Sequence, residues 1–283
     1  MPVSNPSSSF DFDRATYVEK IEDRQGTVTF SGHVHDGWDI MGNANGGYLM
    51  ALAGHALSQA TDRPDCLTLT AHFLAPCPAG DVRISVTPIR SGRRFATARA
   101  EMWITSENRP KQILQVVATM ADLATDPGGP TAVRHTMPAL SPWVDCPLLS
   151  GTSVSDFAHL HGRLATRGEP EDLDFRNGRP SGTGRMRGWF AFADGREVDT
   201  RALLLASDAF PPAVFNLDVG TSWVPTVEMT VHTRARPSAG PVACFFTTRY
   251  LQDGLLEEDG EMWDSSGRLV AQSRQLALAP RAD

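Results

Sequence analysis

Hydrophobic and polar residues alternate along most of this chain, which is the pattern of strands with one buried face. In CLTLTAHFLAP (66–76), Leu67, Leu69 and Ala71 alternate with threonines and a histidine, and successive strand side chains point to opposite faces of a sheet. Short turns separate further stretches of this kind. They predict strands at 24–34, 66–76, 81–90, 93–104 and 111–121, and again at 185–195, 226–235, 240–251, 257–267 and 268–279.

Two segments lack this alternation and are predicted to be helices. GNANGGYLMALAGHAL (42–57) begins with small polar residues and glycines and then becomes apolar on every side. Such a helix must be buried all round, and its many small residues would let a curved sheet approach it closely. VDTRALLLASDAFPPAVFNL (198–217) predicts a second helix, bent at Pro211 and Pro212 because proline lacks the N–H of a helical hydrogen bond.

The second series of predicted elements repeats the first. When the sequence is shifted by 160 residues, 13 of the 49 positions that start at Leu67 are identical to their counterparts. The shift places Gln115 on Gln275, and it places Tyr48 on Asp208. We therefore expect two copies of one helix-plus-sheet unit whose sheets join edge to edge, with the two helices equivalent.

The elements together predict an α+β fold in which a long helix is wrapped by a curved antiparallel sheet, twice in one chain. Residues 1–20 are expected to form a loose N-terminal arm, 21–125 the first unit and 181–283 the second unit. The segment between them, 126–180, is rich in proline and glycine. We expect it to be a long connection with a helix around 154–164, since a wholly structureless loop of this length is uncommon.

Composition excludes several classes of partner. The net charge is −7, so no overall basic field would attract nucleic acid or an anionic membrane. No apolar run reaches the roughly 18 residues that a membrane span needs. The first residues lack the features of a signal peptide, and the four cysteines form no CxxC. We therefore expect a cytoplasmic protein with reduced thiols.

The glycine pair at the start of the first helix permits two interpretations. Gly46 and Gly47 can serve a tight turn and close packing, or their free N–H groups can point at a ligand oxygen. Neither GxGxxG nor GxxxxGK[ST] occurs, which disfavours a nucleotide loop. The absence of GxSxG disfavours a serine hydrolase. His33 and His35 share one strand face, but no third ligand accompanies them, so no metal site is expected.

Gly46-Gly47-Tyr48 at the start of a small-residue helix, the duplicated unit and SDAFPPAVF (207–215) resemble one known family. They are similar to the double hotdog acyl-CoA thioesterases of the type II, TesB-like group, over about residues 24–122 and 184–279. The resemblance implies a double hotdog fold without a cofactor or metal, acting in lipid metabolism. It also implies hydrolysis of an acyl-CoA thioester to a free acid and coenzyme A.

In that family an aspartate on the second helix, a threonine at the start of the next strand and a glutamine in the last strand hold the attacking water. These residues map onto Asp208, Thr226 and Gln275. The chemistry is sensible, because a carboxylate can take a proton from water while a hydroxyl and an amide orient it. Gly46, Gly47 and Tyr48 are expected to contact the substrate, through helix-start N–H groups or as a wall of the acyl tunnel.

Each assignment has a structural alternative. Asp208 could cap the short segment after the proline bend, Thr226 could simply begin a strand, and Gln275 could be structural because Gln115 matches it in the first copy. Two other functions also stay open: a non-catalytic acyl-thioester binding protein, and a hotdog dehydratase or hydratase. The latter typically uses an Asp/His pair, and no histidine follows Asp208 closely in the sequence. We expect a homodimer.

Overall fold

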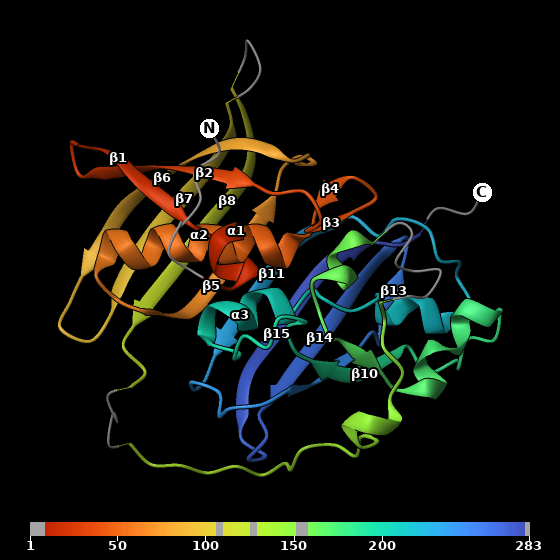
Figure 1. Ribbon diagram of the computed structural model, residues 1–283. Coiled ribbons are helices and arrows are strands. Elements are labelled where there is room, and N and C mark those ends of the chain that lie inside the picture. The colour runs from red at the N-terminus through yellow and green to blue at the C-terminus, as the bar shows by residue number, and fades with distance from the viewer. Residues whose placement is uncertain (1–8, 106–109, 125–128, 151–157, 281–283) are drawn as a thin grey trace.

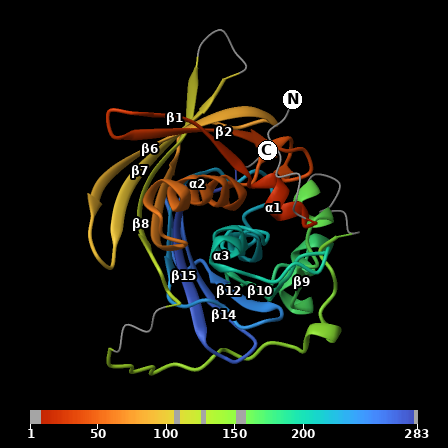
Figure 2. The same cartoon turned by 60° about the vertical axis from the view of Figure 1, so that its left-hand side comes forward.

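The computed structural model describes residues 9–105, 110–124, 129–150 and 158–280 (Figure 1). One antiparallel sheet of 13 strands dominates it, and two helices, α2 (Gly46–Thr61) and α3 (Thr200–Ala206), lie against its concave side (Figure 2). From one edge to the other the strands are β1 (Val18–Arg24), β2 (Thr27–Val34), β6 (Gly80–Ser91), β7 (Ala96–Ile104), β8 (Lys111–Ala121), β5 (Asp65–Phe73), β11 (Thr226–Thr233), β15 (Leu269–Leu278), β14 (Leu255–Trp263), β12 (Val242–Thr247), β10 (Arg185–Phe190) and β9 (Arg167–Gly168). The short strand β13 (Leu251–Gln252) pairs with β14, and β3 (Asp39–Ile40) pairs with β4 (Asn43–Ala44).

The strand order is nearly symmetric about the central pair β5 and β11. The order β2-β6-β7-β8-β5 on one side corresponds to β10-β12-β14-β15-β11 on the other. Thr70 lies opposite Thr230 in this central pair, and their hydroxyl oxygens are 2.9 Å apart. These two residues are 160 positions apart, so the sequence shift matches them with each other. The approximate twofold axis that relates the two halves therefore passes between them.

The strand register corrects the alignment of the last strands. In the first half His72 and Glu101 both lie opposite Gln115, and in the second half their counterparts His232 and Glu261 both lie opposite Gln272. Gln272 is therefore the counterpart of Gln115, and the ungapped match of Gln115 with Gln275 was wrong. The connection between the last two strands is longer in the first half than in the second, which an ungapped shift cannot accommodate.

Helix α2 is buried between the sheet and α3. Asn45 caps its first turn by accepting a hydrogen bond from the Tyr48 N–H at 3.0 Å. Most of the following residues are fully buried, as an all-round apolar helix must be. A Cβ atom on Gly47 would lie only 2.7 Å from the carbonyl oxygen of Leu204. Gly47 thus permits α3 to approach α2 closely. We had expected the small residues of α2 to permit close approach of the sheet.

The second helix is much shorter than the sequence predicted. α3 ends at Ala206, before the proline pair, and a separate 3₁₀ helix, η4 (Ala213–Leu217), follows. A continuous helix through this region would need an N–H from Pro211 to the carbonyl of Ser207, which proline cannot provide. The prediction of one bent helix over 198–217 was therefore wrong.

The two N-caps also correct the pairing of helix residues. Asp199 caps α3 through the N–H of Ala202, as Asn45 caps α2 through the N–H of Tyr48. Counted from these caps, Tyr48 corresponds to Ala202, and the counterpart of Asp208 is Gly54. The expected match of Tyr48 with Asp208 does not hold in three dimensions.

The predicted arm and connection contain more structure than expected. Residues 9–20 include α1 (Asp11–Ala15), whose Phe12 is completely buried, and the start of β1, so this part is not loose. The strand expected at 24–34 begins after a turn in which Gly26 has a φ of +79°.

The described part of the connection contains three 3₁₀ helices: η1 (Trp143–Asp145), η2 (His159–Gly162) and η3 (Pro170–Asn177). The helix expected at 154–164 falls partly outside the described residues, and its described part contains only η2.

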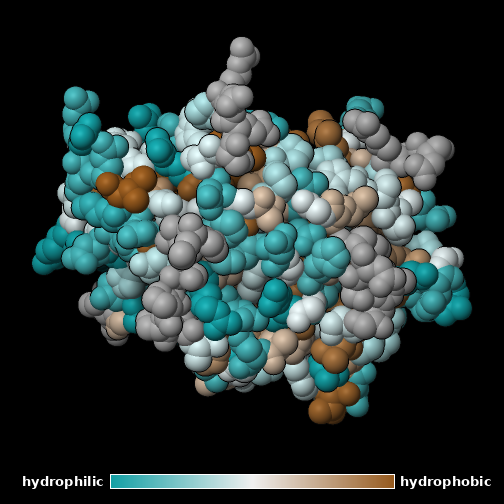
Figure 3. Space-filling view, turned by 45° about the horizontal axis from the view of Figure 1, so that its top comes forward, coloured by the Kyte–Doolittle hydropathy of each residue, from teal (hydrophilic) through white to brown (hydrophobic). Residues whose placement is uncertain are grey.

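The face of the molecule shown in Figure 3 has few extended apolar areas. In Figure 3 most of the visible face is hydrophilic, and hydrophobic residues form small separate patches. Scattered exposed apolar side chains of this kind are normal for a folded domain. Among the described residues, no helix combines the length and the apolar character that crossing a membrane would require.

Candidate functional site

A cavity of about 470 Å³ opens where α2 begins and α3 ends. Four of the predicted site residues line it: Gly46 from the first turn of α2, Asp208 just after α3, Thr226 at the start of β11, and Gln275 in β15. Most of the remaining wall is apolar, with Leu49 from α2 among others. The fold therefore brings residues that are up to about 230 positions apart to one enclosed space.

The carboxylate of Asp208 lies on the N-terminus of the other half's helix. Its Oδ2 accepts a hydrogen bond from the Gly47 N–H at 3.0 Å and one from Asn45 Nδ2 at 2.8 Å. Asn45 Nδ2 also donates to the backbone oxygen of Asp208 at 2.7 Å. The N–H groups at a helix start are unpaired within the helix and carry partial positive charge, so they favour an anion.

Burial and hydrogen bonding act on Asp208 in opposite directions. Burial raises the pKa of its carboxyl to about 6, while the N–H groups of Gly47 and Gly46 and the amide of Asn45 lower it. Burial is the largest of these effects. The groups that lower the pKa of Asp208 are all neutral, and no arginine or lysine is among them. A carboxylate with a pKa near 6 is ionised at neutral pH and is still a competent proton acceptor.

Gln275 is specific to the second half of the molecule. It is 5% exposed and lies opposite Met229 and Glu258 in the sheet. The corresponding neighbours in the first half are Leu69 and Ala98, which lie opposite Ala118. The match with Gln115, which favoured a structural role for Gln275, is thus removed.

Tyr48 does not join the other predicted site residues. Its ring is completely buried and stacks on Trp38, with ring centroids 5.3 Å apart. Its hydroxyl donates to the Ala15 carbonyl at 2.8 Å and accepts from the His35 N–H at 3.1 Å. Tyr48 anchors α1 and β2 to α2, and it is not among the residues that line the cavity.

Sequence reasoning missed a buried acid near Asp208. Glu258, in β14, accepts a hydrogen bond from the Ala213 N–H at 2.6 Å, which holds η4 against the sheet. Burial, together with the nearby negative charge of Asp208, raises the pKa of Glu258 to about 7, although the hydrogen bond from the Ala213 N–H lowers it. Its counterpart in the first half, Ala98, is apolar. In the sequence Glu258 looks like any polar residue of an alternating strand, so the pattern does not indicate that it is buried beside Asp208.

Two further cavity residues come from the expected connection. His161, in η2, is 3% exposed, and Arg176, in η3, is half-buried. The hydrophobic pattern gave no indication of either residue, because their segment forms only short 3₁₀ turns. Asn45 was also missed, although an asparagine immediately before a helix is a recognisable N-cap.

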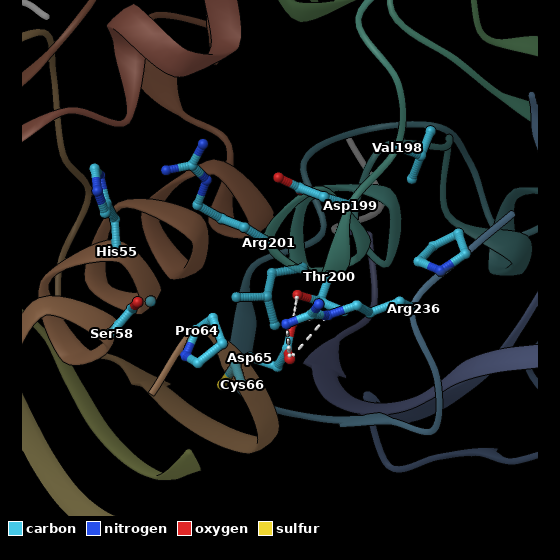
Figure 4. A pocket seen from close by; sticks show the side chains of 13 residues that line it. His55, Ser58, Pro64, Asp65, Cys66, Val198, Asp199, Thr200, Arg201 and Arg236 are labelled. Atoms are coloured by element: carbon cyan, nitrogen blue, oxygen red, sulfur yellow. Dashed lines mark hydrogen bonds and ion pairs between the residues drawn. The ribbon is translucent and has the colours of Figure 1, made fainter. Parts of the chain in front are cut away.

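A second cavity, of about 490 Å³, lies at the other end of the helix pair, where α2 ends and α3 begins (Figure 4). Two acids line it, Asp65 at the start of β5 and Asp199, the N-cap of α3. Asp65 is bound by neighbours on several sides. Arg236 Nη2 lies 2.8 Å from Asp65 Oδ2, and the hydroxyl of Thr200 donates to Oδ1 at 2.7 Å. The N–H of Leu123 donates to Oδ2 at 2.7 Å.

No cluster of three or more potential metal ligands occurs among the described residues. His33 and His35 do lie together, with ring centroids 4.8 Å apart. His33 Nδ1 is 2.6 Å from Asp81 Oδ1, so this histidine has a carboxylate partner on the neighbouring strand.

Family models match both halves of the chain. Residues 34–121 match the acyl-CoA thioesterase N-terminal domain, and residues 144–279 match the acyl-CoA thioesterase C-terminal domain. The chain therefore belongs to the acyl-CoA thioesterase family, as the motif resemblance predicted. The second match begins inside the expected connection and so includes η2 and η3.

Individual proteins are similar over nearly the whole chain. An uncharacterised protein of Mycobacterium tuberculosis is 28% identical over 274 residues, which cover 89% of this chain and 91% of that protein. The structure of a candidate thioesterase II from Thermobifida fusca superimposes with a TM-score of 0.84 at 28% identity, over 99% of this chain and 100% of the other.

A hot dog fold protein of unknown function from Alicyclobacillus acidocaldarius gives a TM-score of 0.82 at 20% identity, over 98% and 100%. The large antiparallel sheet with few helices is accordingly an α+β hot dog architecture.

Proposed function

We propose that this protein hydrolyses an acyl-CoA thioester to a free acid and coenzyme A at the Asp208 cavity. The observation that carries the proposal is the placement of the Asp208 carboxylate. It is held by Asn45 and Gly47 at the N-terminus of α2, inside a largely apolar cavity, and no cationic side chain among the described residues pairs with it. Membership of the acyl-CoA thioesterase family supports this reaction class.

In the proposed reaction, Asp208 is the general base. The hydrogen bonds that Asp208 accepts from Asn45 and Gly47 both end on Oδ2, and in the proposal Oδ1 accepts a proton from a water molecule. That water attacks the thioester carbonyl carbon, while the Thr226 hydroxyl and the Gln275 amide orient it. The carbon–sulfur bond then breaks and the coenzyme leaves as a thiolate. A thiol with a pKa of about 8.5 needs little assistance to leave, and it recovers the proton from Asp208.

The glycines act differently from our expectation in this scheme. Gly47 donates its N–H to Asp208, and the N–H of Gly46 also lowers the pKa of that carboxyl. In the proposal both glycines position the Asp208 carboxylate and stabilise its charge. Only Gly46, which lines the cavity, is still proposed to contact the substrate directly. Tyr48 supports the helix from behind and is no longer proposed to bind substrate.

The finer organisation is also a proposal. The strand order around β5 and β11 supports a double hotdog with units at 21–125 and 181–283, joined by 126–180. A homodimer, a role in lipid metabolism and a cytoplasmic location stay predictions.

A thiol-release assay of purified protein on a chain-length series of acyl-CoA esters tests the function. We expect release of free coenzyme A from at least one ester, with a preference for one range of chain lengths that the cavity can accommodate. Binding of acyl-CoA without release from any ester would instead support an acyl-thioester binding protein.

One observation favours a second enzyme class, a hydratase or dehydratase. Such enzymes use an aspartate with a histidine, and the structure places His161 in the Asp208 cavity. His161 is not among the groups that shift the pKa of Asp208, so close coupling between them is not supported. Measuring loss of 2-enoyl-CoA absorbance alongside thiol release separates the two reactions, and we expect thiol release alone.

A further inference from the structure

Arg176 carries a positive charge into the Asp208 cavity, and no acid among the described residues pairs with it. The structure gives it no ion pair or side-chain hydrogen bond with any described residue, and its Nε is buried and unsatisfied. Burial alone lowers the pKa of its guanidinium. A half-buried, uncompensated arginine is costly unless a ligand supplies the missing negative charge.

The neighbouring arginines show that this is unusual for the region. Arg179, two residues after the end of the same 3₁₀ helix, pairs with Asp174 of that helix at 3.0 Å. On the adjacent strand β10, Arg185 and Arg187 both bind Asp172. Arg167 on β9 lacks an acid but donates to the Cys146 carbonyl at 2.6 Å. Among the described arginines between residues 158 and 190, Arg176 is therefore set apart by having neither an acid nor a hydrogen-bond acceptor.

The position of Arg176 is fixed by its surroundings. The ring of Phe175 packs on Phe215 of η4, with centroids 5.5 Å apart. Asn216, which is completely buried, donates its amide N–H to the Asp172 carbonyl at 2.8 Å. Helix η3 is therefore attached to η4, and Arg176 does not depend on a flexible loop to reach the cavity.

His161 provides a second unsatisfied polar group in the same cavity. Its Nδ1 is buried and has no partner among the described residues. Burial and the nearby charge of Arg176 lower its pKa to about 4, so the ring is neutral at physiological pH. A neutral imidazole can donate one N–H to an oxygen atom beside the guanidinium.

We propose that Arg176 and His161 bind an anionic oxygen group of the thioester substrate, at a point away from the reacting carbonyl. This inference rests on the proposed function. Two sources have the required chemistry: a carboxylate at the far end of the acyl chain, and a phosphate of the coenzyme. Arg176 is not among the groups that shift the pKa of Asp208, and the proposal therefore places the anion site apart from the reactive end.

Four substrates distinguish the two sources: the hexanoyl and adipoyl thioesters of coenzyme A, and the same two acyl groups on pantetheine, which lacks phosphate. The test variant is Arg176→Gln. Arg179→Gln, which removes a paired arginine just after the same 3₁₀ helix, is the matched control, and Arg176→Lys keeps the charge. Circular dichroism and thermal melting establish that each variant is folded.

A charged hydrogen bond of this type corresponds to a change of about tenfold or more in kcat/KM. A loss in Arg176→Gln confined to both adipoyl esters identifies an acyl carboxylate as the ligand. A loss confined to both coenzyme A esters identifies a phosphate. Arg179→Gln should change no substrate by more than about twofold, and Arg176→Lys should recover part of the loss. An equal loss on all four substrates, or no loss, overturns the proposal.

Calorimetric titration with free coenzyme A and with adipate separates this inference from the proposed function, because it needs no turnover. If the wild-type protein hydrolyses none of the esters, the proposed function fails on its own. Binding of either probe that weakens about tenfold or more in Arg176→Gln still supports the anion site. Binding that is equal in both proteins, or undetectable in the wild type, contradicts it.

Discussion

The two cavities at opposite ends of the α2–α3 pair are built on equivalent parts of the fold but hold their acids differently. Each lies between the capped start of one helix and the end of the other, and their volumes are similar, about 470 and 490 Å³. In the first, Asp208 accepts hydrogen bonds from neutral groups, an amide and a helix N–H. In the second, Asp65 is bound by Arg236 and by the Thr200 hydroxyl.

Under the proposed function, this difference explains how one nearly symmetric fold can have a single reactive site. A carboxylate paired with arginine is already neutralised and has its oxygens occupied, whereas Asp208 keeps a raised pKa, and its hydrogen bonds with Asn45 and Gly47 both end on Oδ2. The remaining positions differ in the same sense. Gln275 corresponds to Ala118, and Asp208 itself corresponds to Gly54 in the middle of the longer helix α2.

The largest effect is expected from exchanging the two acids for their amides. Asp208→Asn should lower kcat for thioester hydrolysis by about 10²-fold or more, because it removes the general base while keeping the size of the side chain. Asp65→Asn is the matched control and should keep activity within about threefold when the protein is folded. Equal losses in the two variants would remove the distinction between the cavities.

A smaller loss, of about tenfold, is expected in kcat for Gln275→Ala. The variant loses one hydrogen bond that orients the water, and such a bond is worth about 1.5 kcal/mol. Gln272→Ala alters the residue that the strand register identifies as the counterpart of Gln115, and its activity should be unchanged. If Gln272→Ala were the slower enzyme, then Gln272 and not Gln275 would be the functional glutamine, and the strand register would not identify the functional residue.

Asp65→Ala should mainly affect stability. It leaves the Thr200 hydroxyl and the Leu123 N–H without their acceptor and breaks the contact with Arg236. Because Arg236 is 43% exposed and therefore partly screened by water, we expect a decrease of about 2 kcal/mol in the free energy of unfolding. Urea denaturation measures this change, and a destabilisation below about 0.5 kcal/mol would show that the ion pair is not structural.

The smallest expected effect is on the pH dependence of stability. The folded pKa of Asp208 is about 6, above the ordinary value of about 3.9. The folded state therefore binds more protons between these values, and its stability falls as pH rises from about 4 to 6. Asp208→Asn lacks this contribution, so its stability relative to the wild type should increase by about 1–2 kcal/mol over that range. Denaturation curves at several pH values that stay parallel for the two proteins would contradict the raised pKa.

Sequence patterns predicted the strands well because alternation reports directly on which face is buried. Strands such as β8 begin and end where the pattern placed them. The pattern was less informative where proline ended a helix early, and the ungapped shift failed where the connection between the last two strands changed length. The reactive constellation came from motif resemblance, since no local signal links Asp208 to the helix of the other half.

Other parts of the site depend on tertiary structure that no local pattern encodes. Asn45 is recognisable as an N-cap, but its contact with Asp208 spans 163 residues. His161 and Arg176 lie in 3₁₀ turns without periodicity, and Glu258 looks like an ordinary strand residue. Their roles become visible only when the cavity is assembled.

A crystal structure with a non-hydrolysable thioether analogue of an acyl-CoA tests the central claim most directly. The analogue should lie in the Asp208 cavity, with the atom that replaces the thioester carbonyl carbon within reach of one water molecule bound to Asp208 Oδ1. Thr226 and Gln275 should contact the same water. An analogue bound in the Asp65 cavity, or one whose reactive end lies far from Asp208, would contradict this account.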